Sequence, residues 1–203
     1  MYVEALTLGK NPAAPHANED RLLIYGDTLF GVIDGVTDKS GKLYGGRTGG
    51  RIAGELIDDA LRDVVRSGEH LTAPAADIFS RVDAEFGRAY ANLGITELVQ
   101  SDASQRFAAQ LAVVFSDGRE LRLLQTGDCG VRLNGAEVHL RSNPADDIMG
   151  LVRSRVFHHL VSAGVSPEEA LPAARSAIVQ GPDAPPAELQ ALLGEGQARA
   201  LCA

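Results

Sequence analysis

The sequence predicts an α+β domain in which helices cover antiparallel β-sheets. Strand-like segments come in two blocks, and helical segments follow each block, which is typical of α+β rather than alternating α/β folds. Short turns rich in Gly, Asp and Asn separate neighbouring strands, as in β-hairpins. Hydrophobic residues are 45% of the 203 residues, as in globular proteins, and the core must be mainly aliphatic because aromatic residues are 5%.

Charge and cysteine content limit the environment and the partners that we expect. The 19 basic and 27 acidic residues give a formal net charge of −8, which disfavours nucleic acid and anionic membranes as partners. No apolar run approaches the roughly 20 residues of a membrane helix, and the first residues do not resemble a signal peptide. Two cysteines, Cys129 and Cys202, are too few for a disulfide framework. We expect a cytoplasmic protein, and the sequence indicates no oligomeric state.

The elements of the first block follow from local patterns. Apolar residues alternate or cluster in the expected strands and recur at helical spacing in the two expected helices. A tight turn at Gly26 and Asp27 joins the second and third strands, and a long Gly-rich loop precedes the helices. The expected strands are 2–8, 21–25 and 29–33, the loops are 10–20 and 34–50, and the helices are 52–65 and 78–93. Neither helix shows a polar residue inside its apolar stripe, so both are expected to cover a sheet.

The second block predicts a β-meander followed by helices. Asn134 and Gly135 form a strong type I′ hairpin signal, because both residues tolerate positive φ. Ser166 and Glu169 have the spacing of a helix capping box. The expected strands are 111–115, 121–126, 130–133 and 137–140, and the expected helices are 148–160, one that begins after Ser166, and a short one within 183–194.

Acidic residues gather where the hairpin-paired strands begin and end. Glu19 and Asp20 precede one strand and Asp34 follows the other, so antiparallel pairing would bring them to one edge of the sheet. Carboxylates repel each other there unless a cation compensates, and oxygen ligands suit Mg²⁺ or Mn²⁺. Gly35 would let the backbone approach an ion and offer a carbonyl. A plain turn beside a solvated loop is the alternative, and Asp128 is a second acidic corner with a turn as its alternative.

Together these residues resemble the metal-dependent serine/threonine phosphatases of type 2C. Four pieces match in order and spacing: Asn18–Arg21, Leu29–Gly35 before a Gly-rich loop and a helix, Leu111–Phe115, and Leu121–Cys129 with its Gly-Asp step. The resemblance covers roughly residues 18–140. We therefore expect one phosphatase-like domain over 1–203, with a family-like part, 1–140, and an atypical, mostly helical part, 141–203.

The resemblance implies a fold, a metal centre and a reaction. The implied fold is an antiparallel two-sheet β-sandwich flanked by helices (αββα), with two Mg²⁺ or Mn²⁺ ions at one end. By analogy Asp34 would bridge the ions, Gly35 would bind one through its carbonyl, Glu19 and Asp20 would ligate directly or through water, and Asp128 would hold a third ion. The implied reaction is hydrolysis of phosphoserine or phosphothreonine in a protein substrate by a metal-bound hydroxide, so no side chain is assigned as the nucleophile.

The sequence departs from this family at several positions. An Arg expected before Asn18 is missing, and Lys10, His16 and Arg47 are the residues that could replace it. Arg47 is the candidate phosphate-binding residue, with a solvated loop cation as the alternative. Two late metal aspartates are not found, because after Asp128 the aspartates are only Asp146, Asp147 and Asp183. An incomplete site would hold fewer ions.

Two other functions therefore stay open. The first is a catalytically weak or inactive phosphatase-like regulatory or binding module. The second is a metal-dependent hydrolase of a small phosphate ester. Cys129 is expected to be a small core residue and not a nucleophile.

Overall fold

A computed structural model of the chain describes residues 3–9, 11, 13–14, 17–36, 41–140 and 144–176. The chain separates into two compact units, Met1–Arg141 and Ser142–Ala203. The boundary coincides with the point where the sequence changes character, and the expectation of one domain stays a prediction. The helix expected within 183–194 lies outside the described residues.

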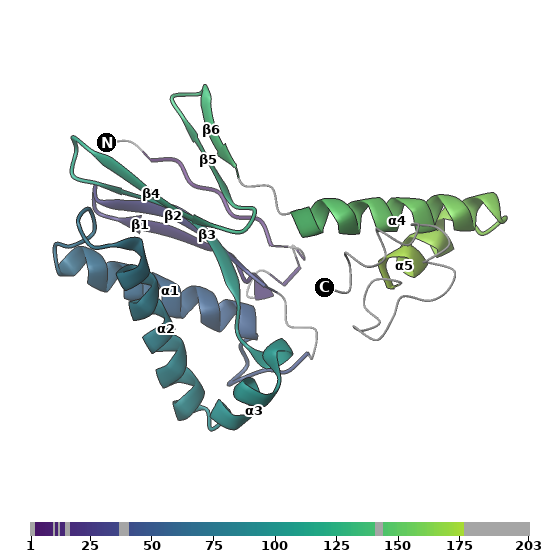
Figure 1. Cartoon of the computed structure of the whole chain (residues 1–203), viewed down its shortest axis with the longest axis horizontal. Helices are drawn as coiled ribbons and strands as arrows, with labels where there is room; N and C mark the ends of the chain where they lie inside the picture. The colour runs from purple at the N-terminus through teal and green to yellow at the C-terminus, as the bar shows by residue number, and fades with distance from the viewer. Residues whose placement is uncertain are drawn as a thin grey trace. The chain divides into compact units, whose positions relative to one another are not determined.

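The first unit is built on a four-stranded antiparallel sheet (Figure 1). Its strands follow chain order, so each is hydrogen-bonded to the strand before it. The strands are β1 (Arg21–Tyr25), β2 (Leu29–Gly35), β3 (Ala109–Ser116) and β4 (Leu121–Thr126). A separate hairpin, β5 (Gly130–Leu133) with β6 (Glu137–Leu140), turns at Asn134 and Gly135, whose φ angles are 50° and 70°. The predicted type I′ turn has these positive angles.

Alternation of side chains along the strands gives the sheet one apolar face. Two helices, α1 (Gly49–Arg66) and α2 (Ala75–Asn92), lie on that face (Figure 1). The core between them contains Leu23, Leu29, Ile33, Ile57, Leu61, Val64, Ile78, Leu111, Val113 and Phe115. Burial of such side chains contributes about 1.5–3 kcal/mol each, so it is the main force that holds the helices to the sheet.

Contrary to the sequence interpretation, the buried face of α1 contains a charged residue. Asp58 is only 4% exposed. Its carboxylate accepts a hydrogen bond from Arg21 Nη2 of β1 at 2.9 Å and another from Arg62, one turn along the same helix. The two guanidinium groups compensate the buried charge, and the bond from Arg21 connects α1 to the first strand.

The segment at 2–8 does not form the expected strand: residues 3–9 have no regular secondary structure. Thr7 is held by a side-chain contact, in which Asn18 Nδ2 donates to Thr7 Oγ1 at 2.8 Å. Apolar alternation alone did not supply the ladder partner that a strand requires.

Each unit contains further helices. In the first unit, α3 (Thr96–Ser101) and a 3₁₀ turn, η2 (Ala103–Gln105), follow α2, and the sequence patterns did not indicate them. The second unit has α4 (Pro144–Ser162) and α5 (Pro167–Ser176). At the start of α5, the Glu169 N–H donates to Ser166 Oγ at 3.4 Å, which is one of the two bonds of a capping box and confirms the predicted helix start. The Ser166 hydroxyl also donates to Glu169 Oε2 at 2.9 Å.

The observed architecture is thus α+β with antiparallel sheets and helices, as the sequence predicts. Packing of a second complete sheet on the outer face, which the αββα sandwich requires, stays a prediction. No helix in the described parts of the chain is long and apolar enough to cross a bilayer.

Candidate functional site

Antiparallel pairing places two of the predicted carboxylates side by side. Arg21 pairs with Ile33 at the end of the β1–β2 ladder, so the next positions outward, Asp20 and Asp34, face each other across the two strands. Both side chains are exposed, and both lie on the outer face of the sheet, away from α1 and α2. The hairpin geometry therefore brings these two carboxylates together, as the sequence predicts.

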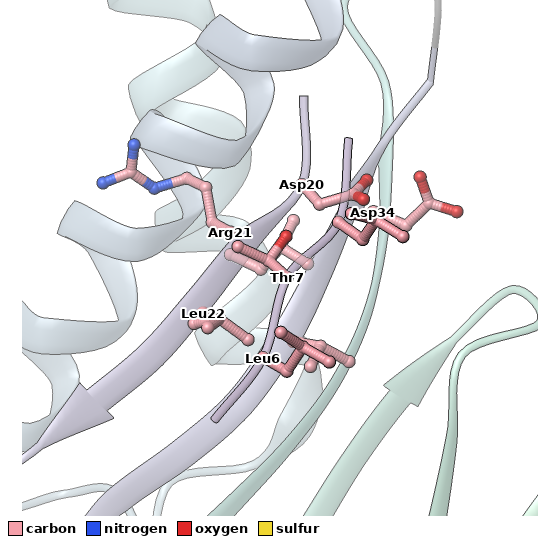
Figure 2. Close-up of a pocket in the computed structure, with 9 residues that line it drawn as sticks. Leu6, Thr7, Asp20, Arg21, Leu22 and Asp34 are labelled. Atoms are coloured by element: carbon pink, nitrogen blue, oxygen red, sulfur yellow. The ribbon is translucent and has the colours of Figure 1, made fainter. Parts of the chain in front are cut away.

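A surface groove of about 350 Å³ runs along this outer face and ends at the two carboxylates (Figure 2). Its apolar wall combines strand residues with the segment that Thr7 anchors. Figure 2 shows the carboxylates of Asp20 and Asp34 at the same end of the pocket and the guanidinium of Arg21 pointing away from it. The lining residues are Leu6, Thr7, Leu8, Asp20, Arg21, Leu22, Val32, Ile33 and Asp34.

The turn after β4 adds a third carboxylate at the same end of the sheet. Asp34 and Gln110 are direct partners across β2 and β3, and Leu111 pairs with Thr126 across β3 and β4. The turn that contains Asp128 therefore follows β4 at the level of Gln110. The Asp128 N–H donates to Gln110 Oε1 at 2.6 Å. Asp20 precedes β1, Asp34 lies at the end of β2, and Asp128 follows β4, all at the same end of the sheet. We call these three residues the acidic row.

The negative charges of all three residues of the acidic row affect the pKa of the Cys129 thiol. Burial raises the pKa of Cys129, and the negative charges of Asp34, Asp128 and Asp20 raise it further, while a hydrogen bond with the backbone of Asp34 acts in the opposite direction. A raised pKa lowers the fraction of thiolate, which is the reactive form, at neutral pH. That Cys129 is a core residue and no nucleophile stays a prediction, and the structure shows Cys129 half-buried.

Glu19 lies on the opposite face of the sheet from the acidic row. It is buried beside the first turn of α1, where a Cβ added to Gly50 would stand 2.9 Å from Glu19 Oε1. A Cβ on Gly35 would meet the Glu19 and Gly50 carbonyl oxygens at 2.7 Å, so glycine at position 35 allows the strand and the helix to approach closely. A carboxylate at a helix N-terminus is favourable. The expected meeting of three carboxylates at the hairpin therefore holds for Asp20 and Asp34 but not for Glu19.

Arg47, the candidate phosphate ligand, is held by a carboxylate of α1. Its Nη1 lies 2.6 Å from Glu55 Oε2, and Arg51 Nε and Arg21 Nη1 lie 3.3 and 3.7 Å from Oε1 of the same residue. About half of the Arg47 side chain is exposed. Phosphate binding by Arg47 stays a prediction, and it would require the guanidinium to exchange Glu55 for a phosphate group.

The donor atoms of the acidic row suit a hard divalent cation. All are carboxylate oxygens, which Mg²⁺ and Mn²⁺ prefer, and the neighbouring Gly35 carries a backbone carbonyl. Within the described ranges, no three His, Cys, Asp or Glu side chains are already grouped closely enough to form a cation site. Exposed carboxylates can rotate, so a cation would draw together side chains that the strands already place at one end.

Sequence analysis did not assign a role to Gln110. The only sequence signal was a polar residue placed directly before the apolar segment 111–115. Its contact with Asp128 depends on strand register, which the sequence pattern does not specify by itself.

Comparison with known proteins adds one structural similarity. No protein-family model and no curated protein match the sequence. Among solved structures, the Mycobacterium tuberculosis serine/threonine phosphatase PstP/Ppp is similar, with 22% identity and a TM-score of 0.34 over 75% of this chain and 55% of that chain. The chain thus spans about half the length of this similar protein.

The reactivity of Cys129 offers a test of the acidic row in the absence of metal. In a Cys202→Ser background with EDTA, we expect the alkylation rate of Cys129 to give a pKa above that of an ordinary thiol. Asp34→Asn should lower this pKa, because it removes a negative charge that opposes thiolate formation, and alkylation at a fixed pH near 8 should become faster. Asp59→Asn, on the exposed side of α1, is the control. An unchanged pKa in Asp34→Asn would place Asp34 too far from the thiol.

Proposed function

We propose that this chain is a divalent-cation-dependent phosphatase domain that hydrolyses phosphoserine or phosphothreonine in proteins. The observation that supports the proposal is the acidic row, in which the register of neighbouring strands leaves Asp20, Asp34 and Asp128 at one end of the sheet. Three carboxylates at one end of a sheet repel each other, and a bound cation would offset that repulsion. The residues of the row belong to the segments that resemble type 2C phosphatases.

The proposed ligands of Mg²⁺ or Mn²⁺ are the carboxylates of the acidic row and the carbonyl of Gly35. When bound, such a cation supplies Lewis-acid chemistry, because it offsets charge on the phosphoryl oxygens and increases the acidity of an attacking water. The residues of this chain would orient the phosphate and its attached peptide. The groove beside Asp20 and Asp34, which is lined by both polar and apolar residues, would provide a surface for that peptide.

Two positions favour the second candidate, a catalytically weak or inactive phosphatase-like binding module. Glu19 faces α1 and not the acidic row, so the row lacks one of the carboxylates expected from the resemblance. Arg47 forms an ion pair with Glu55, so the guanidinium group that could bind a phosphate already has a carboxylate partner. Fewer ligands and a weaker phosphate contact would reduce both ion number and turnover.

Metal removal and restoration will distinguish the two candidates. After treatment with EDTA, the full chain should release no phosphate from a phosphothreonine peptide, and added Mn²⁺ or Mg²⁺ should restore release. Calorimetric titration should then show about two bound ions, the number that the resemblance to type 2C phosphatases implies. Binding of one ion without turnover would instead identify the binding module. Hydrolysis that persists in EDTA would contradict the proposed mechanism, and selective cleavage of p-nitrophenyl phosphate would indicate a small-ester hydrolase.

A further inference from the structure

We infer that Gln110 is a positioning residue that holds the turn carrying Asp128 beside Asp34. The inference rests on the proposed function, because it concerns the spacing of two proposed cation ligands. Its basis is a set of contacts between Gln110 and the turn that carries Asp128.

Strand register places Gln110 between the two carboxylates. It is the direct partner of Asp34 across the β2–β3 ladder, so the two side chains leave the sheet on the same face. On its other side, the chain leaves β4 after Thr126, which is the partner of Leu111. Gln110 is half-buried and therefore has restricted freedom compared with the exposed aspartates. It thus lies between the strand of Asp34 and the turn of Asp128.

A short hydrogen bond connects Gln110 to the turn. The backbone N–H of Asp128 donates to Gln110 Oε1 at 2.6 Å. A side-chain acceptor that captures a turn N–H fixes the local backbone direction, as in other side-chain-to-backbone turns. Because the bonded N–H belongs to Asp128 itself, the contact acts on the residue that carries the carboxylate.

The residue before Asp128 fits closely around the same side chain. Gly127 has φ of 67°, and a Cβ added there would stand 1.5 Å from Gln110 Oε1. Only glycine allows both the positive φ and this approach. A second contact fixes the strand end, because Leu111 N–H donates to Thr126 Oγ1 at 3.1 Å. On the far side of Asp128, Gln125 Nε2 donates to the carbonyl of Cys129. The turn is therefore held on both sides, and Gln110 is the side chain that bonds Asp128 itself.

Fixed direction matters for a cation site built from different strands. Asp34 leaves from a ladder position, whereas Asp128 leaves from a turn, whose backbone has more freedom unless it is anchored. Residues that orient metal ligands without touching the ion typically change metal affinity 10–100-fold when replaced. Gln110 acts as such an orienting residue, because its hydrogen bond fixes the backbone of Asp128, a proposed cation ligand.

Two measurements on the full chain test the role of Gln110. The first is amide hydrogen exchange at Asp128 in EDTA, which reads the positioning contact without any metal. The second is Mn²⁺ affinity by calorimetry. Gln110→Leu removes the acceptor oxygen with little change of size, and Gln110→Glu keeps an acceptor oxygen. Gln105→Leu, a half-buried glutamine of η2, is the matched control.

We expect Gln110→Leu to accelerate exchange at Asp128 and to weaken Mn²⁺ binding roughly 10-fold. Gln110→Glu should restore slow exchange, and Gln105→Leu should change neither quantity. Unchanged exchange in Gln110→Leu would overturn the inference. It would also be overturned if Asp34→Asn and Asp128→Asn weaken Mn²⁺ binding while Gln110→Leu does not, with the proposed function intact. Mn²⁺ binding that is indifferent to both aspartates would overturn the proposed function itself, and the inference would fall with it.

Discussion

Replacement of Asp34 by Asn is expected to reduce Mn²⁺-dependent hydrolysis of a phosphothreonine peptide by at least about 100-fold. Removal of an orienting residue alone costs up to about this factor in a metal site, and a residue that contacts the ion directly should cost no less. Asp34 stands at the centre of the acidic row, opposite Asp20 on one side and Gln110 on the other. Its carboxylate is the one whose charge acts most strongly on Cys129.

The fold should survive this replacement. Asp34 is exposed at the end of β2, and substitutions at exposed positions usually change stability by no more than about 0.5 kcal/mol. Steady-state kinetics, Mn²⁺ calorimetry and circular dichroism on the same samples will separate lost chemistry from lost structure. Asp59→Asn makes the same chemical change on α1 and should retain full activity. Equal activity in Asp34→Asn and the original chain would remove the acidic row from the mechanism.

Replacement of Asp58 by Ala is expected to destabilise the chain by about 3 kcal/mol. Removal of one partner from a buried ion pair typically costs 3–5 kcal/mol, because the remaining charge loses its compensation. Asp58 compensates both Arg21 and Arg62, whose side chains are 34% and 27% exposed. Water reaches part of each guanidinium group, so the low end of the range applies. A loss of this size is a large fraction of the 5–15 kcal/mol that typically stabilises a protein.

Asp59 provides a matched control for this prediction too. It is the next residue on the same helix, but its side chain is exposed. Urea unfolding followed by circular dichroism should give a free energy of unfolding within about 0.5 kcal/mol of the original for Asp59→Ala. If Asp58→Ala and Asp59→Ala lose equal stability, the ion pairs of Asp58 contribute nothing beyond a surface charge.

Local patterns predicted most of the secondary structure. The hairpin turn at Asn134 and Gly135 followed from residues that tolerate positive φ, and the helix after Ser166 followed from its capping box. These features depend on residues close together in sequence. The expected strand at 2–8 was wrong because strand formation needs a partner ladder, which alternation of residue types does not supply.

The site was predicted less completely than the fold. Asp20 and Asp34 were expected to lie side by side because pairing in a hairpin fixes which residues of the two strands stand opposite each other. Glu19, one residue earlier, was expected in the same place, but side chains alternate between the faces of a strand, and its carboxylate lies beside α1. The burial of Asp58 was missed because its charge is compensated by Arg21. Arg21 lies on a strand far from Asp58 in sequence, so the pattern of the helix alone does not reveal this ion pair.

By itself, the sequence determined most of the strands, helices and turns, because these depend on short-range periodicity and on the preferred φ of a few residues. Only the tertiary structure decided which acidic groups share a face and an end of the sheet. That choice depends on the register of β2, β3 and β4, which brings Gln110 between Asp34 and Asp128. Register is set by the packing of the apolar face against α1 and α2, which involves residues far apart in the chain.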